Sequence, residues 1–252
     1  MNMLLFSGAE LVAGLPPDDR RSRHIRQILK KQPGDHLLAG AIDGELAGHT
    51  GQATIESLTE AGLRFSFEAS GLAEPLPPVT LLLGFPRPIQ ANRIFKDLCS
   101  LGIGRIILSG SELGEKSYIE SNFFKHDEYR AALLEGAEQA ANPRLPLVQK
   151  AWTLARALEL LEAAPGQPNQ PGQRWALDPY RAETAFGASA LAATPASPLV
   201  LAIGSERGWT ELELDRLAGR GFGFARLGRR ILKSETACLV ALGVALGQLG
   251  WL

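Results

Sequence analysis

The chain has 252 residues, of which 45% are hydrophobic and 21% are charged, and its 26 basic and 27 acidic side chains leave a net charge of −1. This length suits one large domain or two modest ones, and the apolar fraction excludes an intrinsically disordered chain. No run of about 18 apolar residues occurs, so the sequence predicts no membrane-spanning segment. The near-neutral charge gives no evidence of nucleic-acid binding, which only the distribution of charges can supply.

The cysteine and histidine content excludes two common kinds of site. Cys99 and Cys238 lie far apart in apolar surroundings, so we expect two buried, reduced thiols in a cytoplasmic protein. The four histidines are scattered and show no pairing with cysteines at metal-ligand spacing. The sequence therefore predicts no metal site.

Two segments concentrate the basic residues. Residues 20–31 and 216–233 each contain six Arg or Lys side chains and no acidic one. Such clusters on a neutral chain are typical of a surface that binds a polyanion. The alternative is that both are ordinary solvated faces, and charge alone does not separate the two interpretations.

The N-terminal third is predicted to be a small β-structure. Three short strands separated by glycines are expected at residues 35–40, 51–58 and 62–69, a spacing typical of a barrel or sandwich. Prolines in residues 71–78 favour an extended linker after them.

The remainder alternates between predicted strands and helices. Strands are expected at 78–84, 105–109, 174–178, 198–204 and 222–228, and helices at 89–102, 127–141, 153–163, from Thr210 to about 217, and 235–250. Thr210 and Glu213 have capping-box spacing. This alternation predicts an α/β domain built on a mainly parallel sheet.

Two turns that follow strands are the candidate ligand sites. Residues 203–208 (IGSERG) follow the strand at 198–204, and residues 225–236 (ARLGRRILKSET) lead into the last helix. In open α/β sheets, ligands bind beyond the carboxyl ends of the strands, where glycines allow the backbone to approach. Neither turn has the spacing of a Walker loop or of the dinucleotide fingerprint.

The pair of turns, in this order, resembles the RsmE-type 16S ribosomal RNA uridine-N3 methyltransferases of the SPOUT superfamily. The family pattern G-P-E-G-G is matched at Gly204, Glu206 and Gly208, with Ser205 in place of proline and Arg207 in place of a glycine. The pattern L-G-x-R-[IV]-L-[RK]-x-E-T is matched at unbroken spacing by Leu227, Gly228, Arg230, Ile231, Leu232, Lys233, Glu235 and Thr236. The resemblance extends over nearly the whole chain through weaker matches at His24, Leu29, Lys30, Gly34, Asp35, Glu138, Gln139, Arg144 and Pro146, although Asn142 stands where arginine is usual.

The resemblance implies a fold, a reaction and partners. The fold is α/β, with a PUA-like RNA-binding β-barrel over residues 1–72 and a SPOUT methyltransferase domain with a C-terminal trefoil knot over 75–252. The implied activity is transfer of a methyl group from S-adenosyl-L-methionine to N3 of a uridine in the 16S rRNA of the small ribosomal subunit. The implied protein is a cytoplasmic homodimer that uses neither a metal nor a membrane.

The same resemblance assigns roles to particular residues. Arg230 is the expected catalytic residue, because a guanidinium can stabilise the negative charge that develops on uracil as its N3 proton leaves; the alternative is a structural ion pair with Glu235. Arg20, Arg21, Arg23, Arg26 and Lys30 are expected to bind RNA phosphates. The expected cofactor-binding residues are Leu177, Asp178, Ile203, Gly204, Glu206, Gly208, Leu227, Gly228, Ile231 and Leu232.

Two other functions stay open on the sequence. One is a SPOUT methyltransferase that acts on another RNA position or on a ribose 2′-hydroxyl. The other is a non-catalytic RNA-binding relative, whose loop at Arg207 no longer admits the cofactor.

Overall fold

The computed structural model describes residues 2–162 and 173–252, which form two compact units. The first unit comprises the chain up to Pro75 together with Leu134–Leu145. The second comprises the described parts of Leu76–Leu133 and Pro146–Leu252. The sequence predicts two consecutive domains, over residues 1–72 and 75–252. The structure instead assigns Leu134–Leu145, from within the second range, to the first unit.

The first unit is built on a four-stranded sheet. Its strands follow the order β1-β2-β3-β4, in which β1 is parallel to β2 and the other pairs are antiparallel: β1 (Leu4–Phe6), β2 (His36–Ala41), β3 (His49–Thr59) and β4 (Gly62–Leu72). The predicted strands at 35–40, 51–58 and 62–69 are thereby confirmed, whereas β1 was not foreseen. The described strands form an open sheet rather than a closed barrel, with one further bridge from Leu15 to Leu63.

Two short helices accompany this sheet, α1 (Gly8–Ala13) and α2 (Arg20–Gln27). A capping box between Ser7 and Glu10 starts α1, and the Asp19 side chain accepts a hydrogen bond from the Arg21 amide to start α2. The basic segment at 20–31 is therefore mostly helical. Its apolar residue Ile25 is fully buried in the core of this unit.

The second unit contains a seven-stranded sheet in which every pairing is parallel. The strand order is β7-β6-β5-β10-β8-β11-β9. The strands are β5 (Val79–Gly84), β6 (Arg105–Ser109), β7 (Leu147–Ala151), β8 (Arg174–Leu177), β9 (Thr184–Ala185), β10 (Leu199–Ile203) and β11 (Gly223–Arg226). The predicted α/β class and parallel sheet are confirmed.

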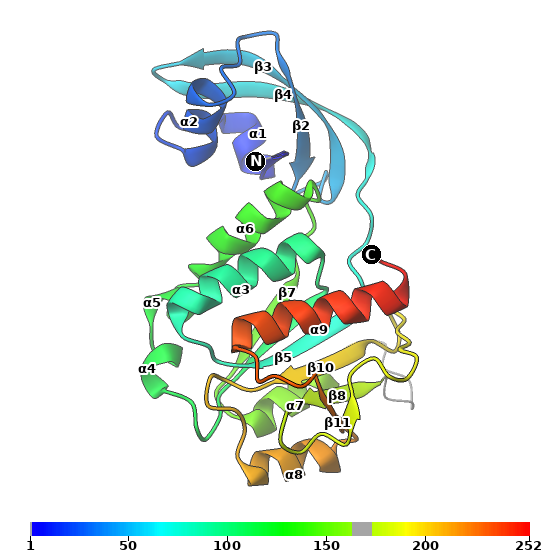
Figure 1. Ribbon diagram of the computed structural model, residues 1–252. Coiled ribbons are helices and arrows are strands. Elements are labelled where there is room, and N and C mark those ends of the chain that lie inside the picture. The colour runs from blue at the N-terminus through cyan, green and yellow to red at the C-terminus, as the bar shows by residue number, and fades with distance from the viewer. Residues whose placement is uncertain (1, 163–172) are drawn as a thin grey trace. The chain divides into compact units, whose positions relative to one another are not determined.

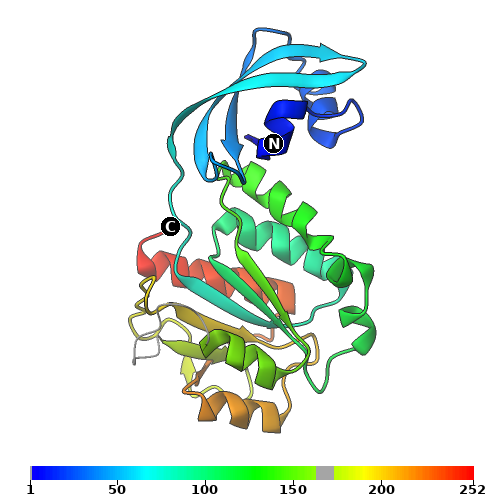
Figure 2. The ribbon, with the colours of Figure 1, turned by 180° about the vertical axis from the view of Figure 1, so that it is seen from behind.

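Helices cover both faces of this sheet. On one face α3 (Pro88–Leu101) and α9 (Ser234–Leu249) lie side by side, and on the other lie α7 (Leu154–Glu162) and α8 (Glu211–Gly219), as the two opposite views show (Figure 1 and Figure 2). The short helices α4 (Lys116–Ile119) and α5 (Asn122–Lys125) precede α6 (Tyr129–Ala140), which starts in the second unit and ends in the first. The prediction of a helix at 153–163 is confirmed through Glu162; residue 163 lies outside the described residues. None of the described helices is long and apolar enough to cross a membrane.

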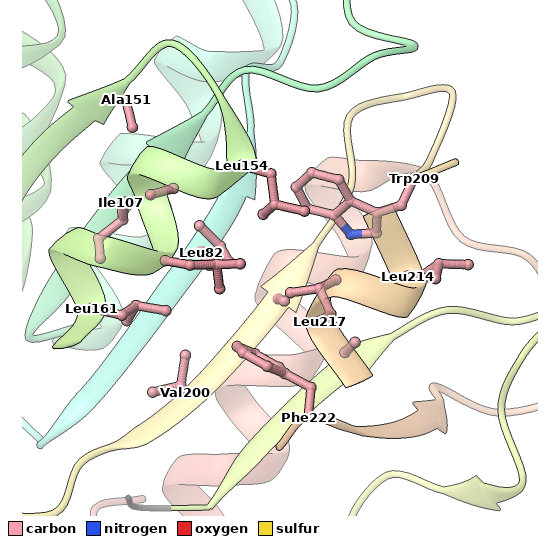
Figure 3. Packing of buried hydrophobic residues seen from close by; sticks show 14 residues of the cluster. Leu82, Ile107, Ala151, Leu154, Leu161, Val200, Trp209, Leu214, Leu217 and Phe222 are labelled. Atoms are coloured by element: carbon pink, nitrogen blue, oxygen red, sulfur yellow. The ribbon is translucent and has the colours of Figure 1, made fainter. Parts of the chain in front are cut away.

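The core between the sheet and α7 and α8 is aliphatic and aromatic (Figure 3). Leu82 and Val200 of the central strands meet Leu158, Leu161, Leu214 and Leu217 of the two helices, and all are at least 97% buried. Trp209, just before α8, is 6% exposed and belongs to the same cluster. This packing anchors the loop between β10 and α8, which begins at Gly204.

Candidate functional site

A cavity of about 540 Å³ lies at the carboxyl ends of β8, β10 and β11. Because neighbouring parallel strands end at the same edge, the three loops that follow them meet there. Expected site residues that line the cavity are Leu177, Asp178, Ile203, Gly204, Glu206, Gly208, Leu227, Arg230, Ile231 and Leu232. Gly228 is not among the lining residues; its φ of 90° turns the last of the three loops.

The loop after β10 is a tight turn that requires glycine. The Gly208 amide donates to the Ser205 carbonyl at 2.9 Å, and Gly208 has a φ of 75°. A Cβ atom on Gly204 would lie 2.7 Å from the Gly208 backbone, closer than real side chains tolerate. The Glu206 carboxylate accepts from the Arg87 amide at 2.9 Å, which ties this loop to the start of α3.

The loop after β8 is held by its own carboxylate. Asp178 is 7% exposed, and its Oδ1 atom accepts from the amides of Tyr180 at 2.9 Å and Arg181 at 2.8 Å. This Asx-type turn fixes the backbone of the loop without regular secondary structure. Leu177 and Asp178 thus line the cavity from a preorganised turn.

The loop after β11 carries the expected catalytic arginine. Arg230 is exposed on the cavity wall, and no carboxylate of the described residues lies within 4.0 Å of its guanidinium. The alternative role, an ion pair with Glu235, is therefore not formed in the described structure. Helix α9 starts at Ser234 without a side-chain cap on its N-terminal amides, and Ser234, Glu235 and Ala237 also line the cavity.

Arg207, which replaces a family glycine, is one of the residues that line the cavity. Its Nη1 atom lies 3.2 Å from Glu115 Oε1, and the Arg207 side chain is 65% exposed. The turn itself keeps its glycine-dependent geometry at Gly204 and Gly208. The substitution therefore adds an ion pair to the loop and a cationic side chain to the cavity lining.

Three buried polar atoms on the cavity wall have no hydrogen-bond partner among the described residues: Gln90 Oε1, Ser205 Oγ and Trp209 Nε1. Buried polar groups in native proteins are normally paired, so these atoms mark places where a bound molecule would complete the site. Sequence reasoning did not assign Gln90 to the site, because α3 precedes the matched motifs by more than a hundred residues. Tyr180, Arg226 and Lys233 also line the cavity without having been assigned.

The basic segment of the first unit divides into two groups. The Arg20 guanidinium binds both carboxylate oxygens of Glu138 at 2.8 Å, and Arg26 donates to the Thr59 carbonyl at 3.2 Å. Arg23 and Lys30 are exposed, and the described residues place no carboxylate in contact with either. These four side chains retain exposed surface.

Arg21 is instead part of a half-buried cluster. Its side chain is 13% exposed and donates to the Leu5 carbonyl at 2.6 Å and to the carboxylates of Glu10 and Asp19. Although burial acts in the opposite direction, hydrogen bonds from Arg21 lower the pKa of both Glu10 and Asp19 below their ordinary values. Arg21 therefore supports the fold of this unit.

Both cysteines are buried, and neither forms a disulfide bond. Burial raises the pKa of the Cys238 thiol far above its ordinary value, with the nearby Glu235 charge adding to the shift. Among the described residues there is no group of three or more potential metal ligands.

Comparison with known proteins identifies the class of protein that carries this fold and cavity. Residues 73–246 match the family described as RNA methyltransferase domain. The chain belongs to this family. Among curated relatives, it is 38% identical over 252 residues to ribosomal RNA small subunit methyltransferase E of Treponema pallidum, covering 98% of this chain and 91% of the relative. It is 27% identical over 245 residues to ribosomal RNA small subunit methyltransferase E 1 of Borreliella burgdorferi, covering 96% and 95%.

Solved structures show the same fold. A ribosomal RNA small subunit methyltransferase E from Neisseria gonorrhoeae, bound to S-adenosyl methionine, aligns with a TM-score of 0.74 at 20% identity over 99% of this chain and 98% of that one. A probable rRNA-methyltransferase from Porphyromonas gingivalis aligns with a TM-score of 0.75 at 19% identity over 98% of each chain. At these identities the likeness shows the fold alone.

Proposed function

We propose that the protein transfers a methyl group from S-adenosyl-L-methionine to N3 of a specific uridine in the 16S rRNA of the small ribosomal subunit. The observation that carries this proposal is the cavity, because it joins the two family motifs to the loop after β8, and all three lie within the matched residues 73–246. Family membership and the names of the relatives, ribosomal RNA small subunit methyltransferases, support the same reaction.

The cavity suits the proposed cofactor in its size and in its unpaired polar atoms. Gly204 and Gly208 line the cavity without a side chain over their backbone, and Ser205 Oγ and Gln90 Oε1 offer polar contacts without partners among the described residues. Side chains of Leu177, Ile203, Leu227, Ile231 and Leu232 supply apolar wall for a purine ring, and Asp178 and Glu206 supply carboxylates. When bound there, the cofactor provides an electrophilic methyl group on a sulfonium.

Arg230 is the residue that we propose to act on the uracil. Loss of the N3 proton places negative charge on the ring and its two carbonyl oxygens. A guanidinium at the cavity wall that is not in an ion pair among the described residues can stabilise that charge, because no existing ion pair must first be broken. Because N3 lies on the Watson–Crick edge, the target uridine must enter unpaired or flipped out.

The first unit is the proposed RNA-binding part, a PUA-like domain over residues 1–72 that precedes the methyltransferase domain over 75–252. Exposed cations on and after α2 support this role, namely Arg20, Arg23, Arg26 and Lys30. Contacts to phosphates fix the position of an RNA without reading its sequence. Arg21 is left out of this set because its side chain, paired with Glu10 and Asp19, is only 13% exposed, whereas that of Arg20, paired with Glu138, is 48% exposed.

We further propose a trefoil knot and a homodimer. The knot is supported by the path from β11, near one end of the sheet, through residues 227–233 to α9, which packs on α3 and β10. The dimer is supported by Val240 and Trp251 on and after α9, which stay 39% and 41% exposed although the helix also buries a full face. An unknotted experimental chain trace, or a monomer by light scattering at micromolar concentration, would refute the respective proposal.

An rRNA substrate implies a cytoplasmic location, which is part of the proposal. The function is tested in two steps. Calorimetry with S-adenosyl-L-methionine is expected to show one site per chain; absence of binding would favour the non-catalytic alternative. Small subunits from a strain lacking the gene are then methylated with labelled cofactor, and the modified nucleotide is identified by mass spectrometry. A methyl group on a ribose or on another base position would favour the other SPOUT alternative.

A further inference from the structure

The cavity has one exposed aromatic side chain at its wall. Of the two aromatic residues among the described lining residues, Trp209 is 6% exposed and packs in the core cluster, whereas Tyr180 is 82% exposed. Tyrosine side chains are enriched where proteins bind partners, because the ring offers an apolar face and the hydroxyl a polar tip. The Tyr180 ring is thus available to a molecule that enters the cavity.

The backbone that carries Tyr180 is fixed on both sides. Before it, the Asp178 carboxylate accepts the amides of Tyr180 and Arg181. After it, the Arg181 guanidinium lies 2.7 Å from Asp215 and packs over the Phe224 ring at 4.9 Å from its centroid. Because the backbone at Tyr180 is already fixed, it loses little conformational freedom when a ligand binds. The Tyr180 ring is therefore a preorganised contact.

The charges around the ring select the chemistry of its partner. Arg226, Arg230 and Lys233 line the same cavity, are exposed, and have no ion pair with a carboxylate among the described residues. Exposed aromatic rings beside unpaired cations are the combination by which proteins hold single-stranded nucleic acid, with bases on the rings and phosphates on the cations. A neutral metabolite would leave these cations without a counter-charge.

We infer that Tyr180 provides the stacking surface for the unpaired base that enters the cavity, while Arg226 and Lys233 bind the adjoining phosphates. The inference rests on the proposed function and adds a substrate-binding residue to it. A base that leaves its helix loses its stacking neighbours, and enzymes that act on such bases replace them with aromatic or apolar side chains. Trp209 cannot do so, because the core cluster already covers it.

The test compares Tyr180→Ala with Tyr180→Phe and with Trp152→Ala, a control that removes an aromatic ring that is 68% exposed and lies outside the cavity lining. For Tyr180→Ala we expect KM for small subunits from the deletion strain to rise roughly tenfold to a hundredfold. Tyr180→Phe and Trp152→Ala are expected to stay within twofold of the parent. The affinity for S-adenosyl-L-homocysteine, measured by calorimetry, is expected to be unchanged in all three variants.

Photo-crosslinking gives a readout that needs no methyl transfer. With 16S rRNA containing 4-thiouridine, irradiation of the parent protein is expected to attach RNA to the peptide that contains Tyr180. An unchanged KM for Tyr180→Ala together with no such crosslink would overturn the inference. If Tyr180→Ala also lost affinity for S-adenosyl-L-homocysteine, the ring would belong to the cofactor site and the inference would be overturned. A loss of dimer mass for this variant in light scattering would overturn it too, because the ring would then belong to a subunit interface. A parent protein that crosslinks through Tyr180 but transfers no methyl group would refute the proposed function while supporting the stacking contact.

Discussion

Replacing Arg21 by Met is expected to loosen the first unit strongly. The change removes the guanidinium but keeps an aliphatic stem, so the Leu5 carbonyl and the carboxylates of Glu10 and Asp19 lose its hydrogen bonds and charge. Among the described residues, Glu10 then keeps only Ser7 as a donor and Asp19 only the backbone amide of residue 21. Breaking a fully buried ion pair costs about 3–5 kcal/mol. Because Glu10 and Asp19 are 31% and 22% exposed, water recovers part of this, and we expect a loss of about 3 kcal/mol.

Hydrogen exchange is the appropriate assay, because the four tryptophans all lie in the second unit and do not report on the first: Trp152, Trp175, Trp209 and Trp251. A loss of about 3 kcal/mol corresponds to roughly 100-fold faster exchange of the protected amides in β1 and α2. Arg23→Met is the matched control, since Arg23 is exposed on the same helix, and its exchange is expected to match the parent. Equal exchange in the two variants would refute the assignment of Arg21 to a supporting cluster.

The same cluster makes the stability of the first unit depend on pH. The pKa values of Glu10 and Asp19 are lowered in the folded protein from ordinary values of 4.5 and 3.8. Their contribution to stability is therefore fully present above about pH 4.5 and is lost as the pH falls through the lowered folded values. The difference in exchange between the parent and Arg21→Met is expected to shrink as the pH is lowered below 4, after correction for the intrinsic exchange rate.

Three further outcomes follow from the described geometry. Arg230→Ala is expected to lower kcat by about 10²–10³ while cofactor affinity stays within a few-fold, and unchanged turnover would remove its electrostatic role. Gly204→Ala places a Cβ 2.7 Å from facing backbone and is expected to abolish measurable cofactor binding in calorimetry, whereas Gly219→Ala, with open space around it, is expected to bind normally. Neutralising Arg23 and Lys30 together is expected to reduce the slope of log K against log salt for rRNA by about 0.7–0.9 per lost phosphate contact, with cofactor affinity unchanged.

The sequence by itself determined the class of the second unit. Its central strands are short and mostly apolar, such as residues 198–204, because both faces of a parallel sheet are covered by helices. The Thr210–Glu213 spacing predicted a helix start that the structure contains, since a capping box is a local hydrogen-bonding pattern. The turns at Gly208 and Gly228 were readable for the same reason, because their positive φ values are a local backbone conformation rather than a distant contact.

Only the tertiary structure decided which of the candidate site residues lie together. The strand order β5-β10-β8-β11 brings Leu177, Gly204 and Arg230 to one cavity and adds Gln90 and Tyr180, which no local motif indicates. The six basic residues of 20–31 look equivalent in sequence. Helix periodicity and the partners Glu10, Asp19 and Glu138 separate them into a half-buried support and an exposed remainder. The sequence gives the charge of each side chain. Whether that side chain is free to bind RNA depends on the carboxylates that the fold brings to it from elsewhere in the chain.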